Sequence, residues 1–201
     1  MSKLVLGDIV DVRAYERERA QVLERIISLK KRRRVPVGPI LTLVFENRET
    51  VRFQIQEMAR AERMLTDEAI QGELDTYNVL IPEGGQLSAT LFVELTSEPD
   101  LREWLPRLVG VERSVTLQIG APPGEVEVVR AEPEATHAAH LTRDDLTASV
   151  HYIRWSLTPS QVDRFGADPV SIAVDHKAYQ HVTPLAPTTK AELLADLLGD
   201  H

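Results

Sequence analysis

Cysteine is absent from this chain of 201 residues. Its absence excludes disulfide bonds, zinc sites with thiolate ligands, iron–sulfur clusters held by cysteine and cysteine nucleophiles. Any metal site must therefore use histidine and carboxylate ligands, and the chain has 6 His and 31 Asp and Glu residues from which to build one.

Long apolar runs are also missing. No segment approaches the roughly 20 consecutive apolar residues that a membrane-spanning helix needs. The first twelve residues do not read as a signal peptide, because Asp8 and Asp11 interrupt their only apolar run. We therefore expect a cytoplasmic protein without a membrane partner.

Two catalytic signatures are absent as well. Gly84 and Gly85 lack the lysine and the strand-to-helix spacing of a phosphate-binding loop, and no Gly-x-Ser-x-Gly elbow occurs. The net charge of −8 disfavours general nucleic-acid binding, because that affinity comes from neutralising phosphates with cations.

The residues that are present predict one globular domain over 1–201, with 43% hydrophobic residues to build its core. Alternating apolar positions predict about seven strands in hairpin-like order, without regular alternation with long helices. The fold class is therefore α+β, with an antiparallel or mixed sheet, a long N-terminal helix, central helices and a C-terminal helix. Polar residues and Pro133 predict a long loop over 131–146.

Helix boundaries follow from capping residues. Asp8 or Asp11 begins the N-terminal helix, which continues to about Arg34 because Pro36 disfavours helical geometry at the residue before it. The expected N-caps of the later helices are Thr66, Ser97, Thr158 and Thr189. The last of these forms a capping-box pattern with Glu192, and Gly199 ends the terminal helix.

The densest group of features lies in residues 30–64. Ile40–Glu46 and Val51–Gln56 alternate with period two, and Asn47 and Arg48 between them predict a β-hairpin followed by a helix over Gln56–Leu65. In this interpretation Arg52, Gln54 and Gln56 line one sheet face, either in solvent or as contacts for a ligand.

A run of five basic residues, Lys30 to Arg34, precedes the hairpin. It complements the dipole at the C-terminus of a helix, for which one or two cations suffice. Because the run is longer than that, it also fits a contact with an anion, a partner protein or, as a weaker alternative, a nucleic acid.

Histidine and carboxylate positions allow a second hypothesis, a metalloprotein without thiolate ligands. Such ligand sets suit Fe, Mn or Zn, and the candidates are His151, His176, His181, Glu57 and Glu62. Structural roles compete with this hypothesis: His151 lies on the apolar face of its strand, and Glu57 has Arg60 three residues on. Glu134, His137 and His140 also have metal-ligand spacing, within the expected long loop.

Several segments resemble an uncharacterised bacterial family of unknown function over about residues 5–198. They are KKRRRVPVGPILTLVFENRETVRFQIQEMARAER, ELDTYNVLIP, SVHYIRWSL and DHKAYQH. Members of that family are often encoded beside a rubrerythrin-like protein and a cysteine-rich Fe–S protein of the heterodisulfide-reductase type. The resemblance implies a redox or peroxide-stress setting and supplies no catalytic residue.

Together these observations predict an accessory or binding protein in a redox pathway that contacts a partner protein or a small anionic ligand. Guanidinium groups hold carboxylates and phosphates with paired hydrogen bonds. The expected contact residues are Arg32, Arg33, Arg34, Arg52, Gln54, Gln56 and Arg60. A rubrerythrin-like or Fe–S protein is the partner that the resemblance implies, and the sequence leaves open whether the chain forms a homo-oligomer.

Overall fold

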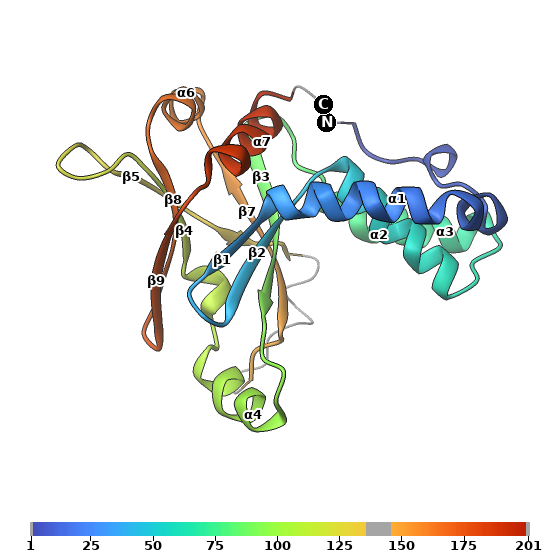
Figure 1. Ribbon diagram of the computed structural model, residues 1–201, viewed down its shortest axis with the longest axis horizontal. Coiled ribbons are helices and arrows are strands. Elements are labelled where there is room, and N and C mark those ends of the chain that lie inside the picture. The colour runs from blue at the N-terminus through green and yellow to red at the C-terminus, as the bar shows by residue number, and fades with distance from the viewer. Residues whose placement is uncertain (1, 136–145, 200–201) are drawn as a thin grey trace.

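The computed structural model describes residues 2–135 and 146–199, which form two antiparallel sheets and a helical lobe (Figure 1). The α-helices are α1 (Val12–Arg33), α2 (Arg48–Ala61), α3 (Asp67–Tyr77), α4 (Glu98–Arg107), α6 (Pro159–Ala167) and α7 (Pro187–Leu198). The strands are β1 (Arg34–Val37), β2 (Leu41–Glu46), β3 (Gln86–Val93), β4 (Val115–Ile119), β5 (Glu127–Arg130), β6 (Glu132–Pro133), β7 (Val150–Ser156), β8 (Val170–His176) and β9 (Tyr179–Pro184). None of the helices described is long and apolar enough to cross a membrane.

The strands form one sheet of five in the order β1-β2-β3-β7-β6 and one of four in the order β5-β4-β8-β9. Neighbouring strands are antiparallel in every pair. The predicted α+β class and antiparallel pairing are therefore confirmed. The described residues contain nine strands rather than about seven. The sequence did not predict β1, β6 and β9, and one predicted strand, over Val51–Gln56, is helical.

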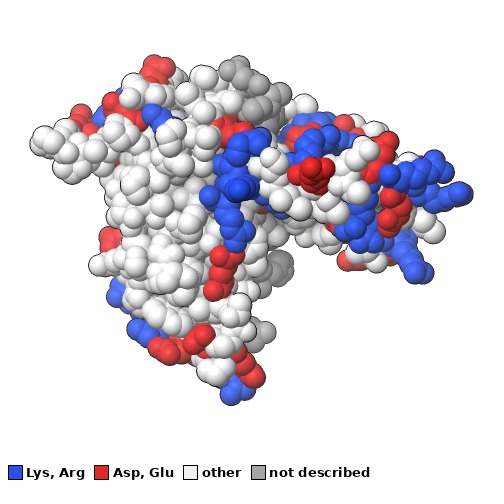
Figure 2. Space-filling model, in the orientation of Figure 1, with Lys and Arg blue, Asp and Glu red and all other residues white. Residues whose placement is uncertain are grey.

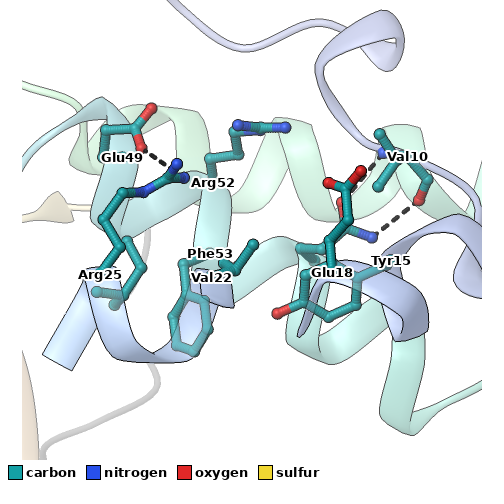
Figure 3. A pocket seen from close by; sticks show the side chains of 10 residues that line it. Val10, Tyr15, Glu18, Val22, Arg25, Glu49, Arg52 and Phe53 are labelled. Atoms are coloured by element: carbon teal, nitrogen blue, oxygen red, sulfur yellow. Dashed lines mark hydrogen bonds and ion pairs between the residues drawn. The ribbon is translucent and has the colours of Figure 1, made fainter. Parts of the chain in front are cut away.

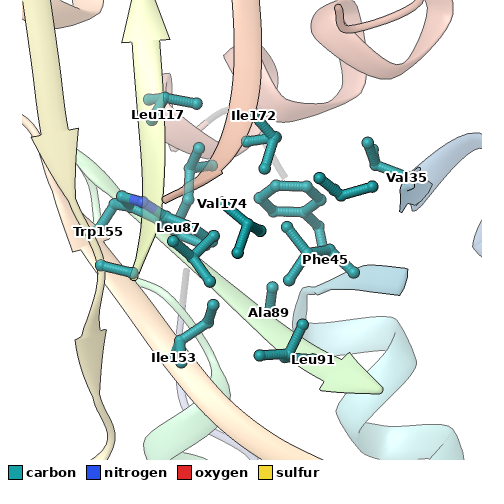
Figure 4. Close-up of a cluster of buried hydrophobic side chains, with 14 of the residues drawn as sticks. Val35, Phe45, Leu87, Ala89, Leu91, Leu117, Ile153, Trp155, Ile172 and Val174 are labelled. Atoms are coloured by element: carbon teal, nitrogen blue, oxygen red, sulfur yellow. The ribbon is translucent and has the colours of Figure 1, made fainter. Parts of the chain in front are cut away.

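The main core lies between the inward faces of the two sheets (Figure 4). Alternate residues of β2, β3 and β7 meet those of β4 and β8, as expected when strands place every second side chain on one face. Phe45 stacks on Trp155 at a centroid distance of 5.6 Å. Phe165 of α6 and Leu193 of α7 extend the same core beyond the strands.

A second core holds the helical lobe together. Val51 and Ile55 of α2 pack with Leu74 of α3 and with Leu4 and Ile9, which precede α1. Tyr152, on the outward face of β7, packs against this cluster. The lobe is thereby attached to the outward face of the five-stranded sheet, which leaves only part of that face available for other contacts.

The long N-terminal helix is confirmed. Asp11 is its N-cap and accepts hydrogen bonds from the backbone N–H groups of Arg13 and Ala14 at 3.0 Å each. The helix ends at Arg33, and the chain continues directly into β1. Later caps follow prediction too, because Thr66, Ser97 and Thr158 each begin a helix.

The predicted hairpin over Ile40–Glu46 and Val51–Gln56 is wrong in its second strand. Asn47 is instead the N-cap of α2 and exchanges hydrogen bonds with Thr50 at 2.9 and 3.0 Å. Val51 and Ile55 are buried on one helix face, because residues four apart also align on a helix. The hairpin partner of β2 is β1, which precedes it, and β3 pairs with β2 on its other side.

The region 175–187 contains β9, which the sequence did not predict; this strand pairs with β8 in register from Ser171 to His176. Two further expectations are corrected. The terminal helix begins at Pro187 with Ala186 as its N-cap, so Thr189 is not the cap. The loop expected over 131–146 begins with β6, and residues 136–145, including His137 and His140, lie outside the described residues.

Gly38 brings two distant segments together at the turn between β1 and β2. Its φ of +72° favours glycine, and a Cβ atom there would lie 2.3 Å from the hydroxyl of Tyr179 and 2.5 Å from the His181 ring. Tyr179 donates its hydroxyl hydrogen to the carbonyl of Val37 at 2.7 Å. This contact links the two sheets at one edge.

Candidate functional site

A groove of about 630 Å³ lies between α2 and the outward face of the five-stranded sheet. Cavities of several hundred cubic ångströms with apolar walls and a few polar groups are typical of small-molecule sites. Fourteen residues line it: Lys30, Arg34, Val44, Glu46, Phe53, Gln54, Glu57, Met58, Ala61, Glu62, Thr90, Phe92, Val150 and Tyr152. We take this volume, referred to below as the sheet groove, as the candidate site.

Glu46 supplies a buried carboxylate to the sheet groove. It is the last residue of β2, and its oxygens accept hydrogen bonds from the hydroxyls of Thr50 and Thr90, the latter at 2.6 Å. Within the described residues no lysine or arginine forms an ion pair with this carboxylate. Each carboxylate oxygen has two lone pairs, so one acceptor position on each remains for a ligand donor.

The Tyr152 phenol and the Gln54 amide line the sheet groove together with this carboxylate. Gln54 of α2 is a hydrogen-bond partner of both Tyr77 and Tyr152. Burial, the largest cause, raises the pKa of Tyr152 above its usual value of 10, and the charge of Glu46 raises it further. Tyr152 is therefore a neutral hydrogen-bonding group at physiological pH.

The walls of the sheet groove are mainly apolar, with Phe53 and Met58 on α2 and Phe92 and Val150 on the sheet. The other lining residues include both basic and acidic side chains. The Lys30 ammonium lies 5.6 Å from the centre of the Phe53 ring, a cation–π distance. The combination suits an apolar ligand with one donor group and one anionic group.

The basic run is mostly engaged within the protein. Arg33 is fully buried, forms an ion pair with Asp196 and donates from Nε to the carbonyl of Phe45 at 2.9 Å. Arg32 binds Glu192 at 2.6 Å, and Arg34 forms an ion pair with Glu94. Figure 2 shows the basic column where α1 meets β1, with acidic side chains at its two ends. Of these three arginines only Arg34 lines the sheet groove.

The sequence predicts that Arg52, Gln54 and Gln56 line one face of a strand. This segment is the helix α2 instead, so the three side chains do not share one face. Arg52 donates to the carbonyl of Asp8 at 2.8 Å, and Gln56 bonds both the N–H and the carbonyl of Val10. These two side chains therefore hold the N-terminal segment against α2. Gln54 points to the other side, into the sheet groove.

A small cavity between α1 and α2 lies beside these contacts (Figure 3). Its volume of about 30 Å³ is far smaller than that of the sheet groove. Arg25 and Glu49 form an ion pair across one side of it at 3.3 Å. The larger sheet groove is therefore the candidate site that we consider further.

Glu57 is held by cations rather than free to bind a metal. Its carboxylate accepts two hydrogen bonds from Arg19 at 2.9 Å and one from the Tyr15 hydroxyl at 2.6 Å. The Arg19 hydrogen bonds are the main reason that the pKa of Glu57 falls from 4.5 to about 2. Arg60 lies 3.6 Å from the same carboxylate and 3.3 Å from Glu16.

The three histidines occupy separate places. His151, on β7, hydrogen-bonds through Nε2 with the Thr147 hydroxyl at 2.8 Å and with the Ala148 carbonyl at 3.0 Å. His176 bonds the Val109 carbonyl at 3.1 Å, and His181 packs on the Tyr179 ring at 4.5 Å. Burial is the main reason that the pKa of His151 lies below 6.5.

The described part of the chain contains no group of three or more His, Asp and Glu residues placed to hold a metal ion. Glu62 lines the sheet groove without joining these histidines. The hypothesis of an Fe, Mn or Zn site therefore has no assembled ligand set within residues 2–135 and 146–199.

The family of the chain follows from a comparison with protein-family models. A model described as "Protein of unknown function (DUF3501)" matches residues 3–197. The chain belongs to the DUF3501 family. This result confirms the family of unknown function that the sequence resembles.

A solved relative supports the same assignment for this DUF3501 chain. It is described as the crystal structure of a novel protein of unknown function from Burkholderia pseudomallei K96243. The two chains are 34% identical and superpose with a TM-score of 0.87 over 98% of this chain and 100% of the other. No curated protein matches the sequence.

Sequence reasoning missed Glu46, Thr90 and Tyr152 as members of the site of this DUF3501 chain. A signal was present: Glu46 and Thr90 lie on the face opposite the main core, where Thr42 and Ser88 also place polar side chains. The assumed hairpin left that face either in solvent or in contact with a ligand, whereas α2 and the sheet enclose it as a groove.

Proposed function

We propose that the protein is a binding protein whose sheet groove takes a small organic molecule. The ligand has an apolar body, a hydrogen-bond donor such as an ammonium or hydroxyl group for Glu46, and an anionic group for Lys30 and Arg34. The single observation that carries the proposal is the buried Glu46 carboxylate, which faces the groove with only hydroxyl partners. A buried charge without a cation is costly, and a ligand donor would offset that cost.

Fewer side chains are available to contact an anionic ligand than the sequence predicts. Arg33, Arg52 and Arg60 act inside the fold, in contacts with Asp196, Asp8 and Glu16 respectively. Lys30 and Arg34 remain as the cations among the lining residues. A carboxylate or sulfonate there would compete with Glu94 for Arg34 and would bind Lys30 without competition from an acidic partner in the described residues.

A fluorescence titration with 1-anilinonaphthalene-8-sulfonate tests the groove, because this probe combines an apolar body with an anion. We expect saturable binding that Val150→Trp abolishes by filling the groove and that Lys30→Glu weakens at least fivefold. Lys177→Glu, at the exposed turn between β8 and β9, is the matched control and should bind like the wild type. Equal binding by wild type and Val150→Trp would refute the groove as the site.

Competition measurements test the role of Glu46. We expect 8-aminooctanoate, which has an ammonium group and a carboxylate, to displace the probe more strongly than octanoate, which has only the carboxylate. Glu46→Gln should remove this preference, since a neutral amide no longer attracts the ammonium group. The same order and size of preference in the variant would exclude donor recognition by Glu46.

The redox or peroxide-stress setting comes only from the family resemblance. It enters the proposal as the kind of partner protein that the chain would bind. A rubrerythrin-like or Fe–S protein would supply the redox centre that a chain without cysteine does not build from thiolates. Titration of a purified rubrerythrin-like protein into this chain, followed by calorimetry, tests it. The absence of heat at micromolar concentrations, with and without a filled groove, would reject that partner class.

A further inference from the structure

A second recess, separate in most of its residues from the sheet groove, lies along the C-terminal half of α1. Its volume is about 420 Å³. Leu23 and Ile27 stand one helical turn apart on α1, and Phe53 of α2 lies beside them. Ile27 is 66% exposed, which is high for a large apolar side chain next to other apolar groups. In Figure 2 a patch of uncharged side chains, with an acidic group beside it, lies next to the basic column.

The charged residues of this recess are all basic: Lys30, Lys31 and Arg34. Lys31 is exposed and has no ion pair in the part of the chain that the structure describes. Lys30 lies over the Phe53 ring, and only Arg34 is paired, with Glu94. A basic apolar surface on a chain of net charge −8 is complementary to an acidic binding partner rather than to another basic surface.

We propose that this recess docks an acidic amphipathic segment of a partner protein. Apolar side chains of the segment would occupy the space between Leu23, Ile27 and Phe53, as in other complexes where a helix lies in an apolar groove. Carboxylates of the segment would pair with Lys31, which does not line the sheet groove, and with Lys30, which lines both sites. The proposal does not rest on the ligand of the sheet groove, because Leu23, Ile27 and Lys31 do not line that groove.

The experiment uses a fluorescent synthetic peptide of 16 residues with Leu at helical i, i+4 and i+7 positions and Glu at the exposed ones. A matched peptide carries Lys in place of every Glu. We expect saturable binding of the acidic peptide by fluorescence anisotropy, weakened as salt rises, and no binding of the basic peptide. Ile27→Asp should weaken binding at least tenfold, and Lys31→Glu at least threefold.

Folding and the sheet groove are controlled separately. Ile27 and Lys31 are exposed, so both variants should keep the wild-type circular dichroism and melting temperature. Lys177→Glu should bind the peptide like the wild type, and Val150→Trp, which fills the sheet groove, should retain peptide binding. Loss of probe binding with retained peptide binding in Val150→Trp therefore separates the two sites.

Three results would overturn the proposal. The first is an acidic peptide that does not bind, or binds equally to Ile27→Asp. The second is self-association in sedimentation that Ile27→Asp abolishes, which would assign the recess to a second copy of this chain. The third is binding to vesicles of anionic phospholipid but not to the acidic peptide, which would assign the recess to a membrane surface.

Discussion

Arg33 and Asp196 form a buried ion pair between the last turn of α1 and the last turns of α7. Their side chains are 0% and 1% exposed. The same guanidinium donates to the carbonyls of Phe45 and Glu46 at 2.9 and 3.2 Å, and lies 3.6 Å from Glu192. One side chain thus joins the first and the last α-helix to β2, the strand that carries Glu46.

We predict that Asp196→Ala lowers the free energy of unfolding by about 3 kcal/mol, because it leaves a buried guanidinium without its main partner. The double variant Arg33→Met, Asp196→Leu should recover most of the loss, since it removes both charges. Chemical denaturation measures both values. Arg102→Ala, which breaks a pair with Glu98 that is 78% and 74% exposed, is the control and should cost less than about 0.5 kcal/mol.

Gly38→Ala should destabilise the protein by about 2 kcal/mol or more, because the new methyl group meets Tyr179 and His181 at a positive φ. Gly72→Ala is the matched control, since Gly72 lies within α3 with no neighbour in the way of a Cβ atom. It should stabilise by about 0.5–1 kcal/mol through helix propensity. Equal melting temperatures for the two variants would contradict the contact between the sheets.

Glu57→Gln should lower stability at pH 7 by about 1–2 kcal/mol, because charged hydrogen bonds from Arg19 become weaker. The pKa of Glu57 is lowered to about 2 in the folded protein, from 4.5. Its contribution is therefore complete above pH 4.5 and is lost as pH falls toward 2. Unfolding measured across that interval should depend less on pH in the variant, and an unchanged dependence would count against this ion pair.

His151→Gln should flatten the pH dependence of stability on the acid side of neutrality. Burial lowers the pKa of His151 below 6.5, although the charge of nearby Glu112 opposes that shift. The unfolded chain then takes up a proton more readily, so wild-type stability declines as pH falls through 6.5. Urea unfolding between pH 7.5 and 5 measures the slope, and a variant as steep as the wild type would show that another group titrates.

Local signals were sufficient for most elements of the fold. Asp11, Thr66, Ser97 and Thr158 cap helices as their hydroxyl or carboxylate chemistry predicts. Strands with clear period-two alternation, such as β3 and β7, were also predictable, because each buries one face against the other sheet.

Local signals failed where one pattern fits two structures. Val51 and Ile55 share a face on a strand and on a helix alike, and the reciprocal hydrogen bonds of Asn47 and Thr50 favour the helix. β9 escaped prediction because its residues are largely exposed and polar, as edge strands often are.

The candidate site was less accessible to sequence reasoning than the fold. Glu46 and Tyr152 are 106 positions apart, and only the pairing of β2, β3 and β7 places them on one face. Arg33 shows the reverse case, a residue expected to meet a ligand that is instead buried against Asp196.

The sequence alone determined that thiolate chemistry is absent, that the chain is α+β and that a long helix with a basic C-terminus begins it, because composition and capping act locally. Only the tertiary structure decided which charges are used inside the fold and which remain available. Buried ion pairs and grooves depend on which distant segments pack together, and residues such as Glu46 and Thr90 acquire their environment only when the sheet and α2 meet.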